Sequence, residues 1–295
     1  MGGYFGARLA AGGEDVTFLA RGAHLKAMQD QGLHIESPNG NLHLPKVQAT
    51  DRPQAVGPVD VVLFTVKLYD VDTSAATLRP LIGPNTVIIT LQNGVEAMDM
   101  VAKHVGEDHV AGGAAYVVVV IDKPGHLRHT TAQSLLFGER DGTRSDRLVA
   151  FEEACARAGF KGKASTEVQT DLWVKFIRLS TWSGMTAVTR SPMGVVRDDP
   201  ALFKMMMDAI DEAIAVGRAR GITFPADILD TTLGMIKGFP PNSKSSMLED
   251  LERGRPLELP WLSGAVVRLG EEAGVPAPTH RFITTVLTPF ARGRK

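Results

Sequence analysis

The sequence predicts an α/β protein in which a doubly wound, mostly parallel sheet is followed by an all-helical domain. Apolar, β-branched segments alternate with helical patterns up to about residue 165, and this alternation requires parallel strands joined by crossover helices. Two of these segments, VDVVLFTVK at 59–67 and NTVIITLQ at 85–92, are apolar almost throughout, as in strands buried on both faces. After residue 165 only helical patterns remain. We therefore expect two domains, 1–165 and 166–295.

The elements of the first domain follow from local patterns. Residues 1–10 (MGGYFGARLA) are typical of an opening helix that ends at Gly12 and Gly13, and 15–21 (DVTFLAR) predict a short strand. Residues 33–48 alternate like strands around the turn signal Pro38-Asn39-Gly40. The other helices expected here are at 23–30, after Lys67 through about Leu78, after Gly94 through about His104, and at 146–158. Further strands are expected within 109–138, including 117–121, and at 160–164.

The second domain is expected to be helical throughout, with Pro and Gly marking the breaks. Its helices are expected at 167–189, 200–220, 225–236, 242–254 and 258–273.

Composition narrows the classes of function. The 295 residues are 44% apolar, enough to fill the cores of two domains, and the formal net charge is −1. This balance argues against broad electrostatic binding to nucleic acid or to an anionic membrane. The single cysteine, Cys155, allows no internal disulfide and is expected to be a packed thiol. There is no apolar run near the roughly 20 residues that span a bilayer and no signal-peptide pattern, so the cytoplasm is the expected location.

The N-terminal segment contains candidates for nucleotide binding. Gly2 or Gly3 fits the last glycine of a G-x-G-x-x-G turn, which lets a pyrophosphate approach the backbone and a helix N-terminus. Arg21 ends the second strand pattern, 19 residues after Gly2. An acidic residue there would hold the ribose 2′-hydroxyl of NAD, whereas an arginine suits the 2′-phosphate of NADP. A solvated surface arginine is the alternative.

Lys67 and Asn93 both come directly after apolar strand patterns. In open α/β sheets the carboxyl ends of the strands face the ligand crevice, so both are candidate ligand contacts. A lysine at the end of an apolar strand is costly unless it has a partner or water. Asn93 could alternatively be only a turn residue before Gly94.

The helical half offers Lys175 as a candidate acid. Leu179 and Ser183 lie four and eight residues later and share its helical face. The ammonium group could donate a proton to a carbonyl oxygen as hydride reaches the carbon. The alternative is a lysine that extends its charged end to solvent at a domain edge.

Three further polar residues lie in KSSMLEDLERGRPLELPWLSG. Ser245 or Ser246 could be only a helix cap, and Glu258 only a first-turn acid. A functional Glu258 would pair with Lys175 or hold a substrate hydroxyl. We expect no metal site, because His126 and His129 stand in a strand-and-loop region, and no Ser-His-Asp arrangement is apparent.

Taken together, five segments resemble the ketopantoate reductases (2-dehydropantoate 2-reductases) over essentially the whole chain. They are GGYFGARLA with FLARG, TVKLYD, LQNGVEA, LWVKF and KSSMLEDLERGRPLE, in the order and spacing of that family. The resemblance implies a Rossmann domain and a helical domain with the active site in the cleft between them. It also implies reduction of 2-ketopantoate to pantoate with NADPH, a step toward pantothenate and coenzyme A.

The resemblance assigns roles by position. For the substrate, it implies Lys175 as the general acid at the keto oxygen, Glu258 as a contact of the hydroxyl and Ser246 as a contact of the carboxylate. Ser183 stands at a further substrate-binding position of the family. For the cofactor, it implies Arg21 at the 2′-phosphate, with Lys67 and Asn93 at the cofactor–substrate junction.

Two departures from the family pattern qualify these roles. Members normally carry a strand and G-x-G-x-x before the position of Gly2, and this chain begins inside that unit; we expect exposed apolar sheet edges and weak NADPH binding from it. Many members also carry asparagines where Leu179 and Ser183 stand, and a leucine side chain neither donates nor accepts a hydrogen bond. The substrate pocket is therefore expected to be less polar.

Two alternatives stay open. Leu179 favours a related dehydrogenase of a branched or aromatic hydroxy acid. The absent phosphate turn favours a non-catalytic, nucleotide-binding relative, although the retention of Lys175, Glu258, Asn93 and Lys67 speaks against it. A small-molecule keto acid is the expected partner, and a homodimer is the expected assembly.

Overall fold

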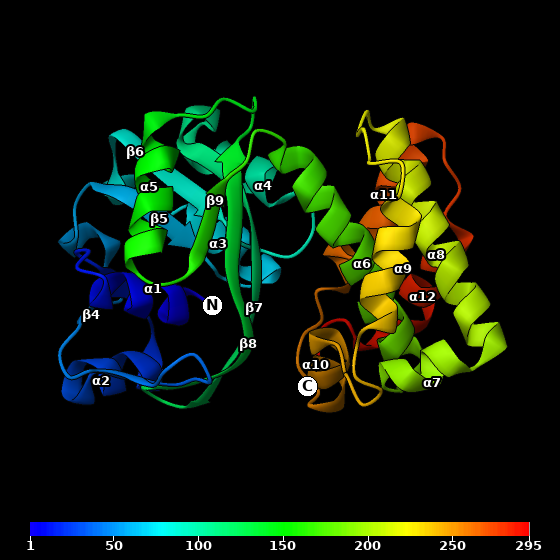
Figure 1. Cartoon of the computed structure of the whole chain (residues 1–295), viewed down its shortest axis with the longest axis horizontal. Coiled ribbons are helices and arrows are strands. Elements are labelled where there is room, and N and C mark those ends of the chain that lie inside the picture. Colours follow the sequence, from blue (N-terminus) through cyan, green and yellow to red (C-terminus); the bar gives the residue numbers. More distant parts are fainter. Residues whose placement is uncertain (295) are drawn as a thin grey trace. The chain divides into compact units, whose positions relative to one another are not determined.

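The computed structural model describes residues 1–294, and the chain forms two compact units. The first, which we call the sheet unit, comprises residues 1–92 and 97–168. The second, the helical unit, comprises the short segment 93–96 and the chain from 169 onward. The predicted fold class, a Rossmann-type sheet domain followed by helices, is confirmed (Figure 1). The division at 165/166 stays a prediction, and the placement of 93–96 with the helices was not foreseen.

The sheet unit contains a seven-stranded sheet in the order β3-β2-β8-β7-β6-β5, with β9 paired to β8. Strands β5, β6 and β7 run parallel, and β7 and β8 form a long antiparallel hairpin, visible in green in Figure 1. Strands β1 and β4 pair with each other in a separate parallel sheet, so β5 is an edge strand. The strands are β1 (Thr17–Leu19), β2 (Leu33–Glu36), β3 (Leu42–Leu44), β4 (Gln48–Thr50), β5 (Val59–Phe64), β6 (Ile82–Thr90), β7 (Val110–Lys123), β8 (His126–Glu139) and β9 (Lys161–Ala164).

The apolar strand β6 is covered on both faces, as its sequence predicts. Val87 and Ile89 belong to the core cluster formed with helices α1 and α5, and Ile88, which points the opposite way, is also fully buried. The helices of this unit are α1 (Gly2–Ala11), α2 (Gly22–Gln31), α3 (Val71–Ala75), α4 (Ala97–Val105) and α5 (Asp146–Arg157).

Two boundaries in the sheet unit differ from expectation, both at prolines. Strand β6 begins at Ile82 rather than Asn85, and Pro84 falls where the pairing with β5 shifts register, so its missing N–H costs no ladder bond. The helix expected through Leu78 ends at Ala75, and a short 3-10 turn that contains Pro80, Arg79–Leu81, follows it.

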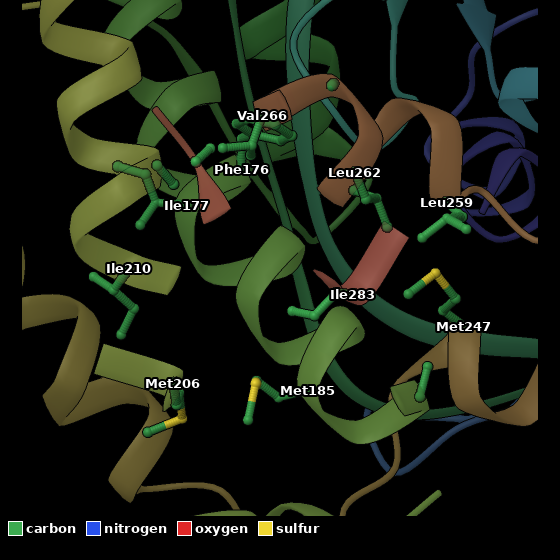
Figure 2. Close-up of a cluster of buried hydrophobic side chains, with 14 of the residues drawn as sticks. Phe176, Ile177, Met185, Met206, Ile210, Met247, Leu259, Leu262, Val266 and Ile283 are labelled. Atoms are coloured by element: carbon green, nitrogen blue, oxygen red, sulfur yellow. The ribbon is translucent and has the colours of Figure 1, made fainter. Parts of the chain in front are cut away.

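The helical unit is built around α6, whose apolar face lies at the centre of the core. Figure 2 shows Phe176 and Ile177 of α6 among apolar side chains that include Ile210 of α8 and Ile283 of α12. The helices are α6 (Val168–Thr189), α7 (Met193–Asp198), α8 (Pro200–Ala219), α9 (Ile228–Lys237), α10 (Ser246–Glu252), α11 (Ser263–Ala273) and α12 (Pro278–Leu287). In residues 1–294 no helix is both long and apolar enough to cross a membrane.

Helices α7 and α12 were not predicted, since prolines next to them were interpreted as breaks. Pro278 instead occupies the first turn of α12, where a missing N–H costs nothing. The helix expected at 242–254 begins only at Ser246, because the Ser245 hydroxyl caps it by accepting from the N–H of Leu248 at 3.1 Å.

A buried histidine makes the stability of the helical unit pH-dependent. The Nε2–H of His280 donates to the carbonyl oxygen of Ala209 at 3.0 Å, and the residue is fully buried. Burial lowers the pKa of His280 from 6.5 to about 4, while Glu212 opposes the shift. Between these pH values the unfolded chain binds the proton more tightly, so the free energy of unfolding falls as pH drops from about 6.5 toward 4.

We expect urea unfolding to show this loss, on the order of 1–3 kcal/mol, between pH 7 and pH 4.5. His280→Gln removes the titration and keeps a side-chain N–H, so its stability should fall less over that range. Equal pH dependence in both proteins would show that His280 does not carry the effect.

Candidate active site

Lys175 is held inside the helical unit by its place in α6. The next two residues, Phe176 and Ile177, are fully buried in the core, and the Lys175 side chain is itself only 7% exposed. Burial lowers the pKa of Lys175 to about 8, and the charge of Arg178, one helical turn away, lowers it as well. The negative charge of Glu258 raises it and so offsets part of the shift.

Glu258 is fixed by buried residues on both sides. It precedes the 3-10 turn Leu259–Trp261 and is 6% exposed, while Leu257 and Leu259 are buried in the core. Ser263, which opens α11 just after this turn, packs closely against α6 at Gly184, where a Cβ would lie 2.8 Å from the Ser263 hydroxyl oxygen. Glu258 is close enough to Lys175 for their charges to interact.

Asn93 completes the cluster from a distant part of the sequence. Its Nδ2 donates to Oε2 of Glu258 at 3.4 Å. The segment turns at Gly94, whose φ of +93° suits glycine, and is tied to α11 by Glu96, which accepts from Arg268 at 2.7 and 2.8 Å. The sequence placed Asn93 at a strand end, and the structure brings it to Glu258.

These three residues place a buried ammonium group near a carboxylate that accepts a hydrogen bond from Asn93. A buried ammonium group whose pKa lies near 8 is protonated at neutral pH and gives up its proton more readily than an exposed lysine. Glu258 interacts with this charge, and Asn93 donates to Glu258. The arrangement can therefore protonate an oxygen atom brought to Lys175.

The serines predicted as substrate contacts are placed differently from one another. Ser183 is 3% exposed, whereas Ser246 is exposed at the start of α10. Ser245 is buried, caps α10 and lies 2.7 Å from the hydroxyl of Thr186. The cap is therefore Ser245, which leaves Ser246 available, and the roles of Ser183 and Ser246 stay predictions.

Of the candidate cofactor residues, Asn93 belongs to the helical unit, and the others lie in the sheet unit at the ends of strands and of α1. Arg21 is exposed two residues after β1, and its Nη2 donates to the Ser74 hydroxyl at 3.3 Å. Lys67 is half-buried three residues after β5. Gly2 and Gly3 open α1, and a Cβ on Gly2 would lie 2.5 Å from the Thr65 hydroxyl oxygen, so the start of α1 meets the end of β5 only because the residue is glycine.

The histidines and the cysteine that could carry other chemistry lie outside the Lys175 cluster. Residues 1–294 contain no group of His, Cys, Asp or Glu suited to a metal ion. His129 is buried, with its Nδ1 2.8 Å from the Ser37 hydroxyl. Burial raises the pKa of Cys155 to about 12, so its thiol is inert at neutral pH.

The sequence interpretation missed Arg178 and the Glu96–Arg268 pair. Arg178 was visible as a second basic residue one turn after Lys175, on a helix that is otherwise apolar there. The ion pair joins residues 172 positions apart, and no local pattern reveals such a contact.

Two family models match the chain. The model for ketopantoate reductase PanE/ApbA matches residues 1–142, and the model for the C-terminal domain of that family matches residues 167–291. The chain belongs to the ketopantoate reductase family. It is therefore an oxidoreductase of a family that depends on a nicotinamide cofactor and acts on a small keto acid.

Individual relatives span nearly the full length. The 2-dehydropantoate 2-reductase of Mesorhizobium japonicum is 31% identical over 95% of this chain and 91% of its own. A PanE/ApbA family ketopantoate reductase from Ralstonia eutropha superposes with a TM-score of 0.90 at 29% identity, covering 97% of this chain and 94% of its own. A D-mandelate dehydrogenase, solved with NADH and anilino(oxo)acetate, shares the fold at 18% identity (TM-score 0.88; 99% and 95% covered).

Proposed function

We propose that this reductase converts 2-ketopantoate to pantoate with NADPH, in pantothenate biosynthesis, and that Lys175 is the general acid. The observation that carries the proposal is the buried ammonium group of Lys175 beside the Glu258 carboxylate, which Asn93 contacts at 3.4 Å. The family and its curated relatives act on this substrate by name, which supports the choice of keto acid.

Each residue of the cluster has a task in this proposal. The Lys175 ammonium donates its proton to the keto oxygen and becomes the neutral amine, which water reprotonates after the alcohol leaves. Glu258 holds the ammonium by its charge, and Asn93 holds Glu258. Contacts from Glu258 to a substrate hydroxyl and from Ser246 to the substrate carboxylate remain part of the proposal.

The sheet unit has residues that fit NADPH. The exposed Arg21 guanidinium, steadied by Ser74, suits a 2′-phosphate, and no carboxylate stands at that strand end to favour NAD. Gly2 and Gly3 at the start of α1 fit the pyrophosphate, and Lys67 fits the nicotinamide side. When bound, NADPH supplies the hydride that reduces the keto carbon.

The test is oxidation of NADPH by the purified chain with 2-ketopantoate, with pantoate identified by mass spectrometry. Saturable formation of pantoate supports the proposal. Turnover confined to other 2-keto acids would keep the reductase and reject the substrate, and a lack of turnover with every keto acid would reject the activity.

Arg21→Gln should weaken NADPH far more than NADH. The variant loses a charge-assisted contact to the 2′-phosphate that NADH lacks, so we expect the Kd for NADPH to rise about 10–100-fold and that for NADH to change less than about threefold. Fluorescence titration of both nucleotides measures this, with the exposed Arg220→Gln as the matched control. Equal changes for both nucleotides would exclude Arg21 as the 2′-phosphate ligand.

A further inference from the structure

Apolar side chains follow Lys175 along its own face of α6. At about 100° per residue, Leu179 and Trp182 fall within about 40° of Lys175 around the helix axis, so they follow it along one face. Both are partly buried and pack against the margin of the core, together with Val95 and Phe239. Val95 is two residues after Asn93 in the sequence, so one of these apolar side chains is close in the chain to a residue of the Lys175 cluster.

The Trp182 ring is backed by a second aromatic ring. Trp182 and Phe239 are stacked, with centroids 4.4 Å apart and an interplanar angle of 27°. Stacking of this kind holds a flat surface in place at little further entropic cost. We call the surface formed by Leu179, Trp182 and Phe239 the apolar wall.

Polar groups farther along this face are already engaged or buried. Thr186 is fully buried, and its hydroxyl bonds the Trp182 carbonyl oxygen and the Ser245 hydroxyl at 2.8 and 2.7 Å. Ser183 is 3% exposed. Arg178 adds a positive charge, which attracts the carboxylate common to all 2-keto acids and so does not distinguish their side chains.

We propose that the apolar wall binds the substrate side chain, so that the apolar bulk at C3 contributes more to the selection of 2-keto acids than the hydroxyl group that Glu258 contacts. This rests on the proposed function, since it concerns the substrate of the same reaction. The two methyl groups of 2-ketopantoate would lie against Leu179 and Trp182. An apolar pocket gains about tenfold or more in kcat/KM from each well-packed carbon group, whereas an apolar side chain gives a hydroxyl nothing.

Three matched substrates test the proposal. They are 2-ketopantoate, 3,3-dimethyl-2-oxobutanoate, which lacks only the hydroxyl, and 4-hydroxy-2-oxobutanoate, which lacks only the two methyl groups. We expect kcat/KM for the dimethyl acid to exceed that for the unbranched hydroxy acid at least about tenfold, although both should fall below that for 2-ketopantoate. The reverse order in the wild-type enzyme would overturn the proposal while leaving the proposed function intact.

Variants assign the effect to the wall. Trp182→Ala should reduce the preference for the dimethyl acid over the unbranched acid at least fivefold, and Leu179→Asn should raise the preference for 2-ketopantoate over the dimethyl acid about tenfold. Val188→Asn, the same kind of change at a partly buried position on the opposite side of α6, should alter neither ratio. Leu179→Ser replaces Leu179→Asn if the latter does not fold, as judged by circular dichroism.

The outcomes separate the two proposals. Unchanged ratios in folded Trp182 and Leu179 variants would overturn the role of the wall, although the enzyme would still be a keto-acid reductase. Failure of the wild-type enzyme to reduce any of the three acids would overturn the proposed function and this inference with it.

Discussion

Lys175→Met should lower kcat/KM for keto-acid reduction by about 10²–10⁴-fold, the usual contribution of a positioned general acid. Methionine matches the length of lysine and suits a site that is 7% exposed, so the helical unit should remain folded. Binding of NADPH should change little, because Gly2, Gly3, Arg21 and Lys67 all belong to the sheet unit. Steady-state kinetics and nucleotide titration together measure these effects.

Lys204→Met is the matched control, since Lys204 is an exposed lysine of α8 that pairs with Asp208. It should retain wild-type kinetics within about twofold. If Lys175→Met kept more than about a tenth of the wild-type kcat/KM, Lys175 would not be the acid.

The same residue sets the expected pH dependence. Reduction requires the ammonium form, and burial places the pKa of Lys175 at about 8 rather than 10.5. The rate should therefore be constant below this pKa and fall tenfold per pH unit above it. An exposed lysine would keep the rate constant to beyond pH 10.

Glu258→Gln should produce the second large effect, a loss of about 10–100-fold in kcat/KM at pH 7.5. Removing the carboxylate leaves the Lys175 ammonium buried beside Arg178 with no charge from Glu258 to stabilise it, so the pKa of Lys175 should fall further. The basic limb of the pH profile should consequently move to lower pH, and activity should recover in part at pH 6.

Glu249→Gln provides the control, because Glu249 is a more exposed carboxylate of α10 paired with Arg253. Its pH profile should match the wild type. A Glu258→Gln enzyme that lost activity equally at every pH would place Glu258 at the substrate alone, with no effect on the acid.

Sequence patterns predicted the architecture because a strand that is buried on both faces is apolar along nearly its whole length. Strand β6 is apolar almost throughout, and both of its faces are covered. The same logic singled out Lys175, since a lysine in an apolar helix needs a partner. Helix boundaries were predicted less well where prolines occurred, because Pro278 starts a helix and Pro80 follows the end of one.

Contacts between distant segments could not be predicted in this way. Asn93 was expected at the cofactor junction, and nothing local shows that segment 93–96 leaves the sheet unit and is held by Arg268 on α11. The lowered pKa of Lys175 likewise depends on how deeply α6 is buried. Such properties come from tertiary packing, which a single sequence encodes only indirectly.

Transfer of deuterium is the measurement that tests the central claim most directly. NADPH labelled with deuterium on either face of C4 is incubated with 2-ketopantoate and the enzyme, and the product is analysed by mass spectrometry. The account predicts pantoate carrying one deuterium at C2 from one of the two labelled forms, and none with Lys175→Met at matched enzyme and time. Oxidation of NADPH without label in pantoate, or equal labelling by Lys175→Met, would contradict it.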